Sequence, residues 1–374
     1  MEDWQQWLVK IGLVMGGILG ACSYLIYVER KLSAYMQDRM GPNRVGPFGL
    51  LQPIADGLKF ILKEDVIPRY ADRFLFILAP CIALLTTMLA ISVVPFGPTT
   101  LNPDDWQFVI APGLDVGVVF VLALGSLAVY SGILGGWSSN NKYILLGSLR
   151  SSAQVISYEI PLGTSVLCVV LLCGSMNFER IIQFQANQGF WHWNAFTQPL
   201  AMLIFMVSAL AEANRLPFVL HECEQELIGG FPPEYSAMKF ALFFLAEYTH
   251  VITVSFMLSA LFLGGWHFPW IATPDSHYAG AWLVKCLVLW SKVGLLIIGV
   301  MLIRWTLPRF RFDQLMTLAW QGLVPLSFIN LTILLLVKQF EWPVWILTVA
   351  SVLLFVGAVG LNGVMLKKRL HSIP

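Results

Sequence analysis

Nine apolar stretches of this 374-residue chain are each long enough to cross a lipid bilayer as a helix. With 57% hydrophobic and 12% charged residues, the composition lies outside the range of soluble globular proteins. The stretches are continuously apolar and lack the alternation of membrane-barrel strands, so we predict an all-α polytopic membrane protein. The nine expected transmembrane helices cover residues 7–29, 74–96, 113–137, 151–174, 197–214, 237–264, 281–304, 314–337 and 343–366.

Basic residues predict the orientation of the chain in the membrane. Of the 23 Lys and Arg residues, 18 lie in or beside the loops after the first, third, fifth and seventh stretches, or in the C-terminal tail. Because basic residues favour the cytoplasmic side, we expect the N-terminus outside and the C-terminus in the cytoplasm. The formal net charge of +1 gives no support to a nucleic-acid partner.

Two long predicted cytoplasmic loops, 31–73 and 215–236, interrupt what we expect to be a single membrane domain of residues 1–374. In the first loop, a segment rich in Gly and Pro leads into residues 50–63, where apolar residues recur at helical spacing. This pattern predicts an amphipathic helix, which lies in the membrane interface or packs on neighbouring spans. Its apolar residues are Leu50, Leu51, Ile54, Leu58, Ile61 and Leu62.

An acidic segment surrounds the second loop. A charged side chain at bilayer depth is costly, so carboxylates there indicate a functional site by default. In the loop itself, repulsion between acids at alternate positions favours one that keeps a proton near neutral pH; the alternative is a solvated acidic loop. At its start, Glu212 and Arg215 are three apart and could pair on one helix face. The six acids are Glu212, Glu222, Glu224, Glu226, Glu234 and Glu247.

Three further observations concern charged residues inside predicted spans. Glu247 and Glu159 lie well within the sixth and fourth spans, and Lys292 lies in the middle of the seventh. Intramembrane Glu and Lys residues usually pair or line a hydrated cavity. We therefore hypothesise one polar path that joins Glu159, Glu212, Glu222, Glu224, Glu226, Glu247 and Lys292.

The sequence offers no sign of a self-contained enzyme. The six cysteines are dispersed, without a Cys-x-x-Cys motif or a Cys/His cluster, so we expect no metal, haem or iron–sulfur cluster on this chain. Phosphate-binding loops, dinucleotide fingerprints and nucleophile elbows are also missing from the sequence, so we expect no bound flavin either.

Several long motifs resemble a known family, the H subunit of NADH-quinone oxidoreductase, which is the membrane subunit at the foot of respiratory complex I. The resemblance covers nearly the whole chain, and motifs of this length are highly specific. The matching segments are Glu29 to Pro47, Leu51 to Asp56, Lys63 to Asp65, Ala211 to Phe218, Glu222 to Leu227, Glu234 with Tyr235, and Arg304 with Pro308 to Leu315.

The resemblance implies a membrane protein that contains much of a quinone-binding chamber and part of a proton-conducting route. Its implied partners are the peripheral-arm subunits at the quinone site, small membrane subunits and antiporter-like subunits, with redox cofactors in other chains. The implied location is an energy-transducing membrane, the bacterial inner membrane. Carried over by motif, Glu29, Arg30, Arg39, Asp56 and Arg304 line the quinone tunnel. Glu159, Glu212, Arg215, Glu222, Glu224, Glu226, Glu247 and Lys292 belong to the coupling path.

The chain departs from the family pattern in two places. Val219 stands where the family usually has Asp, and His221 nearby is a titratable alternative. The ninth stretch, 343–366, exceeds the eight spans of many relatives. Two rival functions remain open: the equivalent subunit of a complex fed by ferredoxin, a deazaflavin or hydrogen, and an independent ion-coupled transporter. The sequence shows none of the internal repeats expected of many such transporters.

Overall fold

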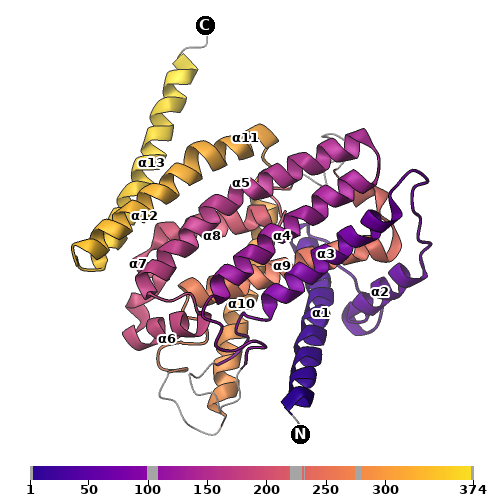
Figure 1. The fold of residues 1–374 in the computed structure, drawn as a ribbon, viewed down its shortest axis with the longest axis horizontal. Coiled ribbons are helices and arrows are strands. Elements are labelled where there is room, and N and C mark those ends of the chain that lie inside the picture. The colour runs from indigo at the N-terminus through magenta and orange to yellow at the C-terminus, as the bar shows by residue number, and fades with distance from the viewer. Residues whose placement is uncertain (1–2, 99–107, 220–229, 231, 274–279, 372–374) are drawn as a thin grey trace.

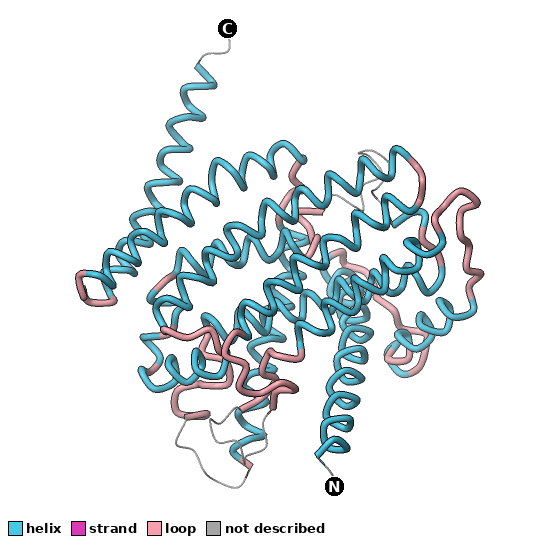
Figure 2. The backbone as a smooth tube through the Cα atoms, viewed as in Figure 1, coloured by secondary structure: helices cyan, strands magenta, loops and turns pink. Residues whose placement is uncertain are grey.

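The computed structural model describes residues 3–98, 108–219, 230, 232–273 and 280–371. These residues form helices and connecting loops, as Figure 2 shows. In chain order the elements are α1 (Asp3–Met36), η1 (Pro47–Gly49), α2 (Gln52–Leu62), α3 (Arg73–Ile91), α4 (Gly117–Ser138), α5 (Lys142–Cys173), α6 (Phe178–Gln188), η2 (Phe190–His192), α7 (Asn194–Thr197), α8 (Pro199–Glu212), η4 (Pro232–Glu234), α9 (Ala237–Phe262), α10 (Ala281–Thr306), α11 (Phe312–Thr317), η5 (Leu318–Leu323, a π-helical turn), α12 (Val324–Gln339) and α13 (Trp345–His371).

The predicted all-α membrane architecture is confirmed. Within the described residues, seven helical segments are long and apolar enough to cross a membrane, and they coincide with seven of the nine expected spans. One of the seven, Phe312–Gln339, contains a π-helical turn. The expected fifth span is a shorter apolar helix, Pro199–Glu212. The expected ninth span lies in α13, which runs from Trp345 to His371 and is apolar over Trp345–Gly360. A helix of 14 residues rises only about 21 Å, less than the ~30 Å hydrocarbon core.

The spans form a stack that other helices cross. α4 packs between α3 and α5, α8 lies against α5, and α9 lies against α3. Figure 1 shows α3, α4 and α5 running in one general direction, whereas α1 and α10 run across them. α1 and α10 both contact α9, so α9 joins the stack to the crossing helices. α13 packs on α12 and α8.

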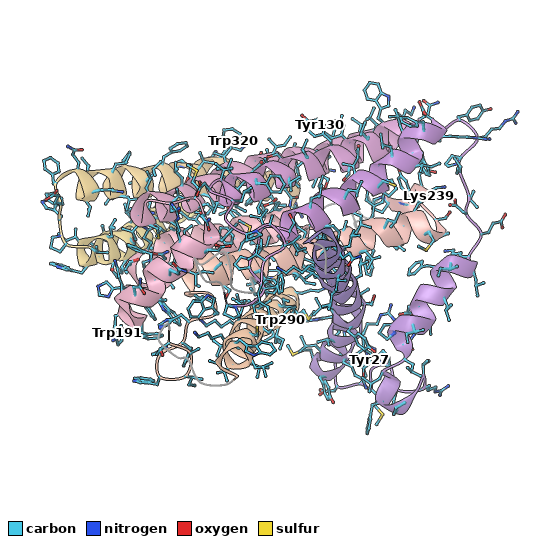
Figure 3. All side chains as sticks on the ribbon, turned by 60° about the horizontal axis from the view of Figure 1, so that its bottom comes forward. Tyr27, Tyr130, Trp191, Lys239, Trp290 and Trp320 are labelled. Carbon is cyan, nitrogen blue, oxygen red and sulfur yellow. The ribbon has the colours of Figure 1, made fainter. Side chains whose placement is uncertain are left out.

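The amphipathic helix predicted over residues 50–63 exists as α2, bounded by Gln52 and Leu62. Its apolar side chains remain exposed: Ile54 by 56%, Leu58 by 54% and Ile61 by 64%. An exposed apolar face on a short helix suits the boundary between lipid and water. The preceding turn is fixed to α1, because the hydroxyl of Tyr27 donates to the carbonyl of Phe48 over 2.7 Å (Figure 3).

The segment between α2 and α3 is fastened to the start of α9. The ammonium of Lys239 donates to both carboxylate oxygens of Asp65, over 2.9 and 2.7 Å. It also lies 5.4 Å from the ring centroid of Phe76 in α3. Figure 3 shows Lys239 at the end of α9 that faces this segment. The position of α9 is therefore linked to the first long loop.

The short helix α6 was not expected from the sequence. Asn177 caps it by accepting a hydrogen bond from the backbone N–H of Glu179 over 2.8 Å. Its apolar face is buried, with Ile181 and Ile182 fully enclosed. Burial also raises the pKa of Glu179, which accepts a hydrogen bond from the backbone N–H of Gly113. The N-cap Asn is the sequence signal that would have indicated this helix.

Close approach of α4 and α5 depends on a glycine. A Cβ at Gly136 would lie 2.0 Å from Oγ and 2.5 Å from Cβ of Ser148. The backbones of α4 and α5 could not stay this close if residue 136 carried a side chain. In contrast, a Cβ at Gly163, further along α5, meets nothing within 4 Å.

We therefore expect Gly136→Ala to lower the thermal stability of the protein, and Gly163→Ala to leave it nearly unchanged. Overpacking of this kind costs about 1–3 kcal/mol. Thermal unfolding of both variants in detergent or in membranes checks the expectation. Equal midpoints for the two variants would contradict it.

Candidate functional site

A large open cavity lies where α1, α9 and α10 meet the loop before α2. Its volume is about 880 Å³, within the range of ligand-binding cavities. Most of its lining residues are polar or charged, including one carboxylate and five arginines. We call it the polar cavity. Its lining consists of Ile26, Glu29, Arg30, Ser33, Arg39, Met40, Gly41, Pro42, Asn43, Arg44, Gln52, Arg215, Phe244, Tyr248, Arg304 and Trp305.

Glu29 is the centre of the polar cavity. Its carboxylate is buried, with a side-chain exposure of 9%, and it joins four segments. One oxygen accepts a hydrogen bond from Nη1 of Arg304 in α10, and the other accepts from the hydroxyl of Tyr248 in α9 over 2.6 Å. Arg215, just after α8, lies 3.5 Å from the same second oxygen. A buried charge in a membrane protein needs such partners.

Arg215 also stacks on Tyr248. Its guanidinium carbon lies 4.1 Å from the ring centroid, which is a cation–π distance. The Arg215 side chain is 11% exposed, so the pair with Glu29 is largely shielded from solvent. Glu29, Tyr248 and Arg215 thus hold one another in fixed positions.

A second ion pair lies at the mouth of the polar cavity. Arg30 donates to Asp56 of α2 over 2.6 Å, and Gln52 donates to the other oxygen of Asp56 over 3.0 Å. The Arg30 side chain is 47% exposed, in contrast to Glu29. Arg39 lines the cavity and donates to Gln37 over 2.7 Å. The structure therefore places Glu29, Arg30, Arg39, Asp56 and Arg304, all five residues expected at a quinone site, in or beside one cavity.

An apolar slot continues from the polar cavity between α1, α2 and α9. Its volume is about 160 Å³, and its lining is predominantly apolar. Ile26, Gln52 and Phe244 line both spaces. Further slot residues include Pro53, Phe60, Ile61, Met238 and Leu245. A charged chamber and an apolar slot with shared walls suit a ligand with a polar head and an apolar tail.

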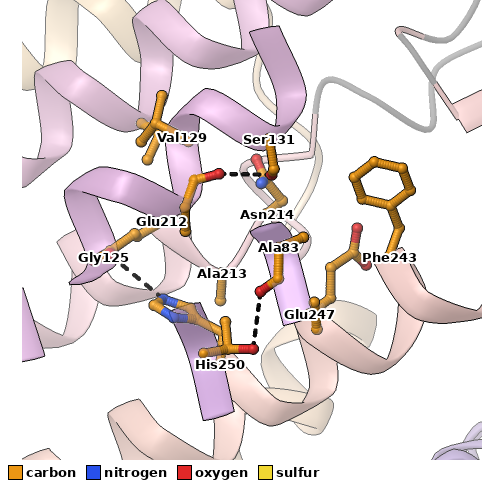
Figure 4. A pocket seen from close by; sticks show the side chains of 14 residues that line it. Ala83, Gly125, Val129, Ser131, Glu212, Ala213, Asn214, Phe243, Glu247 and His250 are labelled. Carbon is orange, nitrogen blue, oxygen red and sulfur yellow. Dashed lines mark hydrogen bonds and ion pairs between the residues drawn. The ribbon is translucent and has the colours of Figure 1, made fainter. Parts of the chain in front are cut away.

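A smaller cavity lies on another side of α9, enclosed by α3, α4, α5 and the end of α8. Its volume is about 100 Å³, and we call it the acidic cavity. Glu212, Asn214, Glu247 and His250 bring polar groups to it, as Figure 4 shows. Oε1 of Glu212 lies 3.6 Å from Nε2 of His250. The other lining residues are Ala83, Thr87, Gly125, Ala128, Val129, Ser131, Val155, Ala213, Phe243 and Ala246.

Glu159 extends the acidic cluster into α5. Its carboxylate accepts a hydrogen bond from the hydroxyl of Ser126 in α4, and it lies close enough to Glu212 for the two to interact electrostatically. Glu247 in turn interacts electrostatically with both Arg215 and His250. Arg215 therefore pairs with Glu29 in the polar cavity and interacts electrostatically with Glu247 in the acidic cavity.

Lys292 lies in α10 and lines neither the polar cavity nor the acidic cavity. Its ammonium donates to three backbone carbonyls in the turn after α9, those of Leu263, Gly265 and His267, over 2.7 to 2.9 Å. It also lies 4.3 Å from the ring centroid of Trp193. These contacts hold the turn in place, and they do not bring Lys292 to the acidic cavity.

The structure also bears on the expected Glu212–Arg215 pair and on the departure from the family pattern at Val219. The expected Glu212–Arg215 pair is wrong: α8 ends at Glu212, Asn214 takes a left-handed backbone (φ 49°), and Arg215 therefore turns toward Glu29. Val219, at the usual Asp position, is buried. His221 and the three loop acids, Glu222, Glu224 and Glu226, lie outside the described residues.

Sequence reasoning missed three polar residues of the site, Tyr248, His250 and Asn214. Tyr248 and His250 flank Glu247 in the order Glu-Tyr-Thr-His, so one helical segment supplies both cavities. The three-residue spacing of Glu247 and His250 was a readable signal. Asn214 gave no signal, because its place depends on where α8 ends. Among the described residues, no group of three or more metal-ligating side chains gathers.

Comparison with known proteins decides the family. A family model described as NADH dehydrogenase matches residues 9–335. The chain is 46% identical to an NADH-quinone oxidoreductase H subunit of Koribacter versatilis over 340 residues, which cover 87% of this chain and 95% of that relative. The chain belongs to the H-subunit family of NADH-quinone oxidoreductase. An H subunit of Cytophaga hutchinsonii is 45% identical over 310 residues, covering 83% of this chain and 90% of the relative. NADH-quinone oxidoreductase subunit 8 of Rhodothermus marinus is 45% identical, covering 87% and 94%.

Both cavities lie within the part of the chain that the family model matches. The match ends at residue 335, so α13 lies beyond it. As a member of the H-subunit family, the chain is one component of an oxidoreductase complex. The resemblance seen in the sequence motifs is thereby confirmed.

The two ion pairs of the polar cavity give a matched test. Glu29→Gln leaves the largely buried Arg215 and the partly exposed Arg304 without their shared counter-charge, and loss of one partner of a buried pair costs about 3–5 kcal/mol. Arg30→Gln removes an exposed pair, for which about 0–1 kcal/mol is typical. We expect thermal unfolding of the assembled complex to show a clear drop for Glu29→Gln only. A similar drop for Arg30→Gln would contradict this assignment.

Proposed function

We propose that this chain is the membrane subunit of a proton-translocating NADH-quinone oxidoreductase, that its polar cavity forms part of the quinone chamber, and that its acidic cavity belongs to the proton path. The observation that carries the proposal is the position of Arg215. It pairs with Glu29 in the polar cavity and interacts electrostatically with Glu247 of the acidic cavity. A change of charge in one cavity therefore alters the energy of charges in the other.

The shape of the polar cavity supports quinone as the ligand. A quinone has a ring with two carbonyl oxygens and an apolar isoprenoid tail. The cavity supplies donors from Tyr248 and the arginines, and the adjoining slot between α1, α2 and α9 is lined mainly by apolar residues. The exposed apolar face of α2 would let the tail enter from the interface.

Reduction of a quinone to a quinol consumes two electrons and two protons. In this proposal the electrons come from the peripheral-arm subunits, and this chain supplies hydrogen bonds and charge. The hydroxyl of Tyr248 donates a hydrogen bond to Glu29. If a reduced quinone took its proton from this hydroxyl, the tyrosinate left behind would add a negative charge beside Arg215. The electrostatic link through Arg215 then biases Glu247 and, beyond it, Glu212 and Glu159.

The proposed proton path comprises Glu159, Glu212 and Glu247 with Arg215, together with the loop acids Glu222, Glu224 and Glu226. Lys292 enters the path only as a prediction from the sequence, since its described contacts are backbone carbonyls and aromatic rings. The proposed partners are the peripheral-arm subunits at the polar cavity, and small membrane subunits and antiporter-like subunits beyond the acidic cavity. The proposed location is the bacterial inner membrane, with the C-terminus in the cytoplasm.

The direct test uses membranes that carry the assembled complex with Glu212→Gln or Glu222→Gln, in which quinone reduction and proton translocation are followed together. We expect both activities to fall at least about tenfold, since a positioned proton-transfer group contributes roughly 10²–10⁴-fold to its step. Glu179→Gln is the control, because Glu179 is a buried carboxylate that lies in α6, away from both cavities. Wild-type activities in both path variants would refute the proposed path.

A glycine gives a second, milder test. A Cβ at Gly125 would lie 2.8 Å from Oε1 of Glu212, so Gly125→Ala must displace the carboxylate while leaving its chemistry intact. We expect slower proton translocation with normal assembly, whereas Gly163→Ala, where a Cβ meets nothing within 4 Å, should behave as wild type. Initial rates in sealed vesicles distinguish the two variants; identical rates would show that the position of Glu212 is unimportant.

A further inference from the structure

His250 is the feature of the acidic cavity that the proposed path does not use. It lies in the middle of α9, a helix long and apolar enough to cross the membrane, and its side chain is only 17% exposed. Burying a polar ring there is costly unless its nitrogens are satisfied. Yet Nε2 has no hydrogen-bond partner within the described protein, and it lies 3.6 Å from Oε1 of Glu212. That separation is just beyond hydrogen-bond length.

A second polar atom of this cavity also lacks a hydrogen-bond partner. Oδ1 of Asn214 is buried and has no hydrogen-bond partner among the described residues, and Asn214 lines the same space. A buried water molecule needs about 10–15 Å³ and two to four polar partners. A cavity of about 100 Å³ with Glu212, Asn214, Glu247 and His250 on its walls meets both needs.

The surroundings of His250 limit which groups can exchange a proton with it. From the end of α8 it faces Glu212, and one turn earlier on α9 stands Glu247. The cavity linings from α3, α4 and α5 are Ala, Gly, Val, Thr and Ser, which bring no titratable group. The imidazole is thus placed between two carboxylates, and Figure 4 shows it directed toward Glu212.

We propose that His250 is a proton-transfer residue that links Glu212 to Glu247 through water in the acidic cavity. The inference rests on the proposed function and adds to it a residue that the sequence motifs did not indicate. In the forward step, a proton on the Glu212 carboxyl moves to Nε2, which leaves a carboxylate and an imidazolium. The imidazolium then gives one proton to the Glu247 carboxylate through water, and the neutral ring is restored. No electron is transferred in either step.

Imidazole suits this role because a neutral ring carries one donor and one acceptor, and it becomes a double donor when protonated. A direct handover between the two carboxylates would need them to share a proton site. With His250 between them, each carboxylate needs to exchange a proton only with the ring or with an adjacent water. His250 therefore acts as a separate station on the path.

The test uses membranes with the assembled complex carrying His250→Gln, His250→Phe or His250→Ala, in which quinone reduction and proton translocation are measured from about pH 5.5 to 8.5, a range that spans the ordinary titration of histidine. Gln keeps hydrogen bonding without titration, and Phe keeps the shape of the ring. We expect proton translocation to fall roughly tenfold in all three, since the proton-transfer step itself loses about 10²–10⁴-fold. His267→Gln is the matched control, because His267 is also a buried histidine but lies beyond the end of α9.

Chemical rescue separates proton transfer from packing. Added imidazole should restore translocation in His250→Ala, whose cavity gains room for it, but not in His250→Phe or in Glu212→Gln. Absence of rescue, or loss of assembly in all three His250 variants, would show a packing role and overturn the inference.

Glu212→Gln, measured alongside, separates the two proposals. If it loses activity while the His250 variants keep wild-type rates, the acidic path stands and the inference about His250 falls. If both keep wild-type rates, both fail.

Discussion

The buried carboxylate of Glu29 is the interaction on which the arrangement of this protein depends. It stands in α1, yet its partners come from α9, α10 and the turn after α8. Removed from water, a carboxylate needs several donors at once, and these three segments must converge to supply them. The convergence leaves open space around the charges, and the polar cavity is that space. Stability and the proposed binding of a ligand therefore depend on the same few atoms.

α9 separates the two cavities and also connects them. Successive residues on a helix point in directions about 100° apart, so Tyr248 reaches the polar cavity while Glu247 and His250 line the acidic one. The helix is itself held at its start by Lys239 and Asp65. A small rotation of α9 would alter both sets of contacts together. That coupling needs no moving domain, only a helix with different chemistry on two faces.

Local patterns in the sequence predict much of the fold. The site, in contrast, depends on contacts between residues that are far apart in the sequence. Runs of apolar residues predicted the spans, and helical spacing predicted α2. The motifs indicated Glu29 and Arg304 as functional, but only packing shows that residues 275 positions apart share a hydrogen bond. Glu212 and Arg215 show the opposite error: their spacing suggested a pair, and the left-handed Asn214 prevents it. Lys292 remains a path residue only by prediction, and the sequence could not reveal that backbone carbonyls are its described partners.

The short length of α8 has an electrical consequence. A helix of 14 residues covers about two thirds of a ~30 Å hydrocarbon core. If α8 begins at one surface of that core, the carboxylate at its other end would sit within the low-dielectric layer across which the membrane voltage drops. Moving one charge through about 100 mV is worth about 2.3 kcal/mol, and a group part-way across experiences a share of that. In the proposed proton path, the proton occupancy of Glu212 would then respond to the voltage itself, and the energy stored by pumping would act back on a residue of that path.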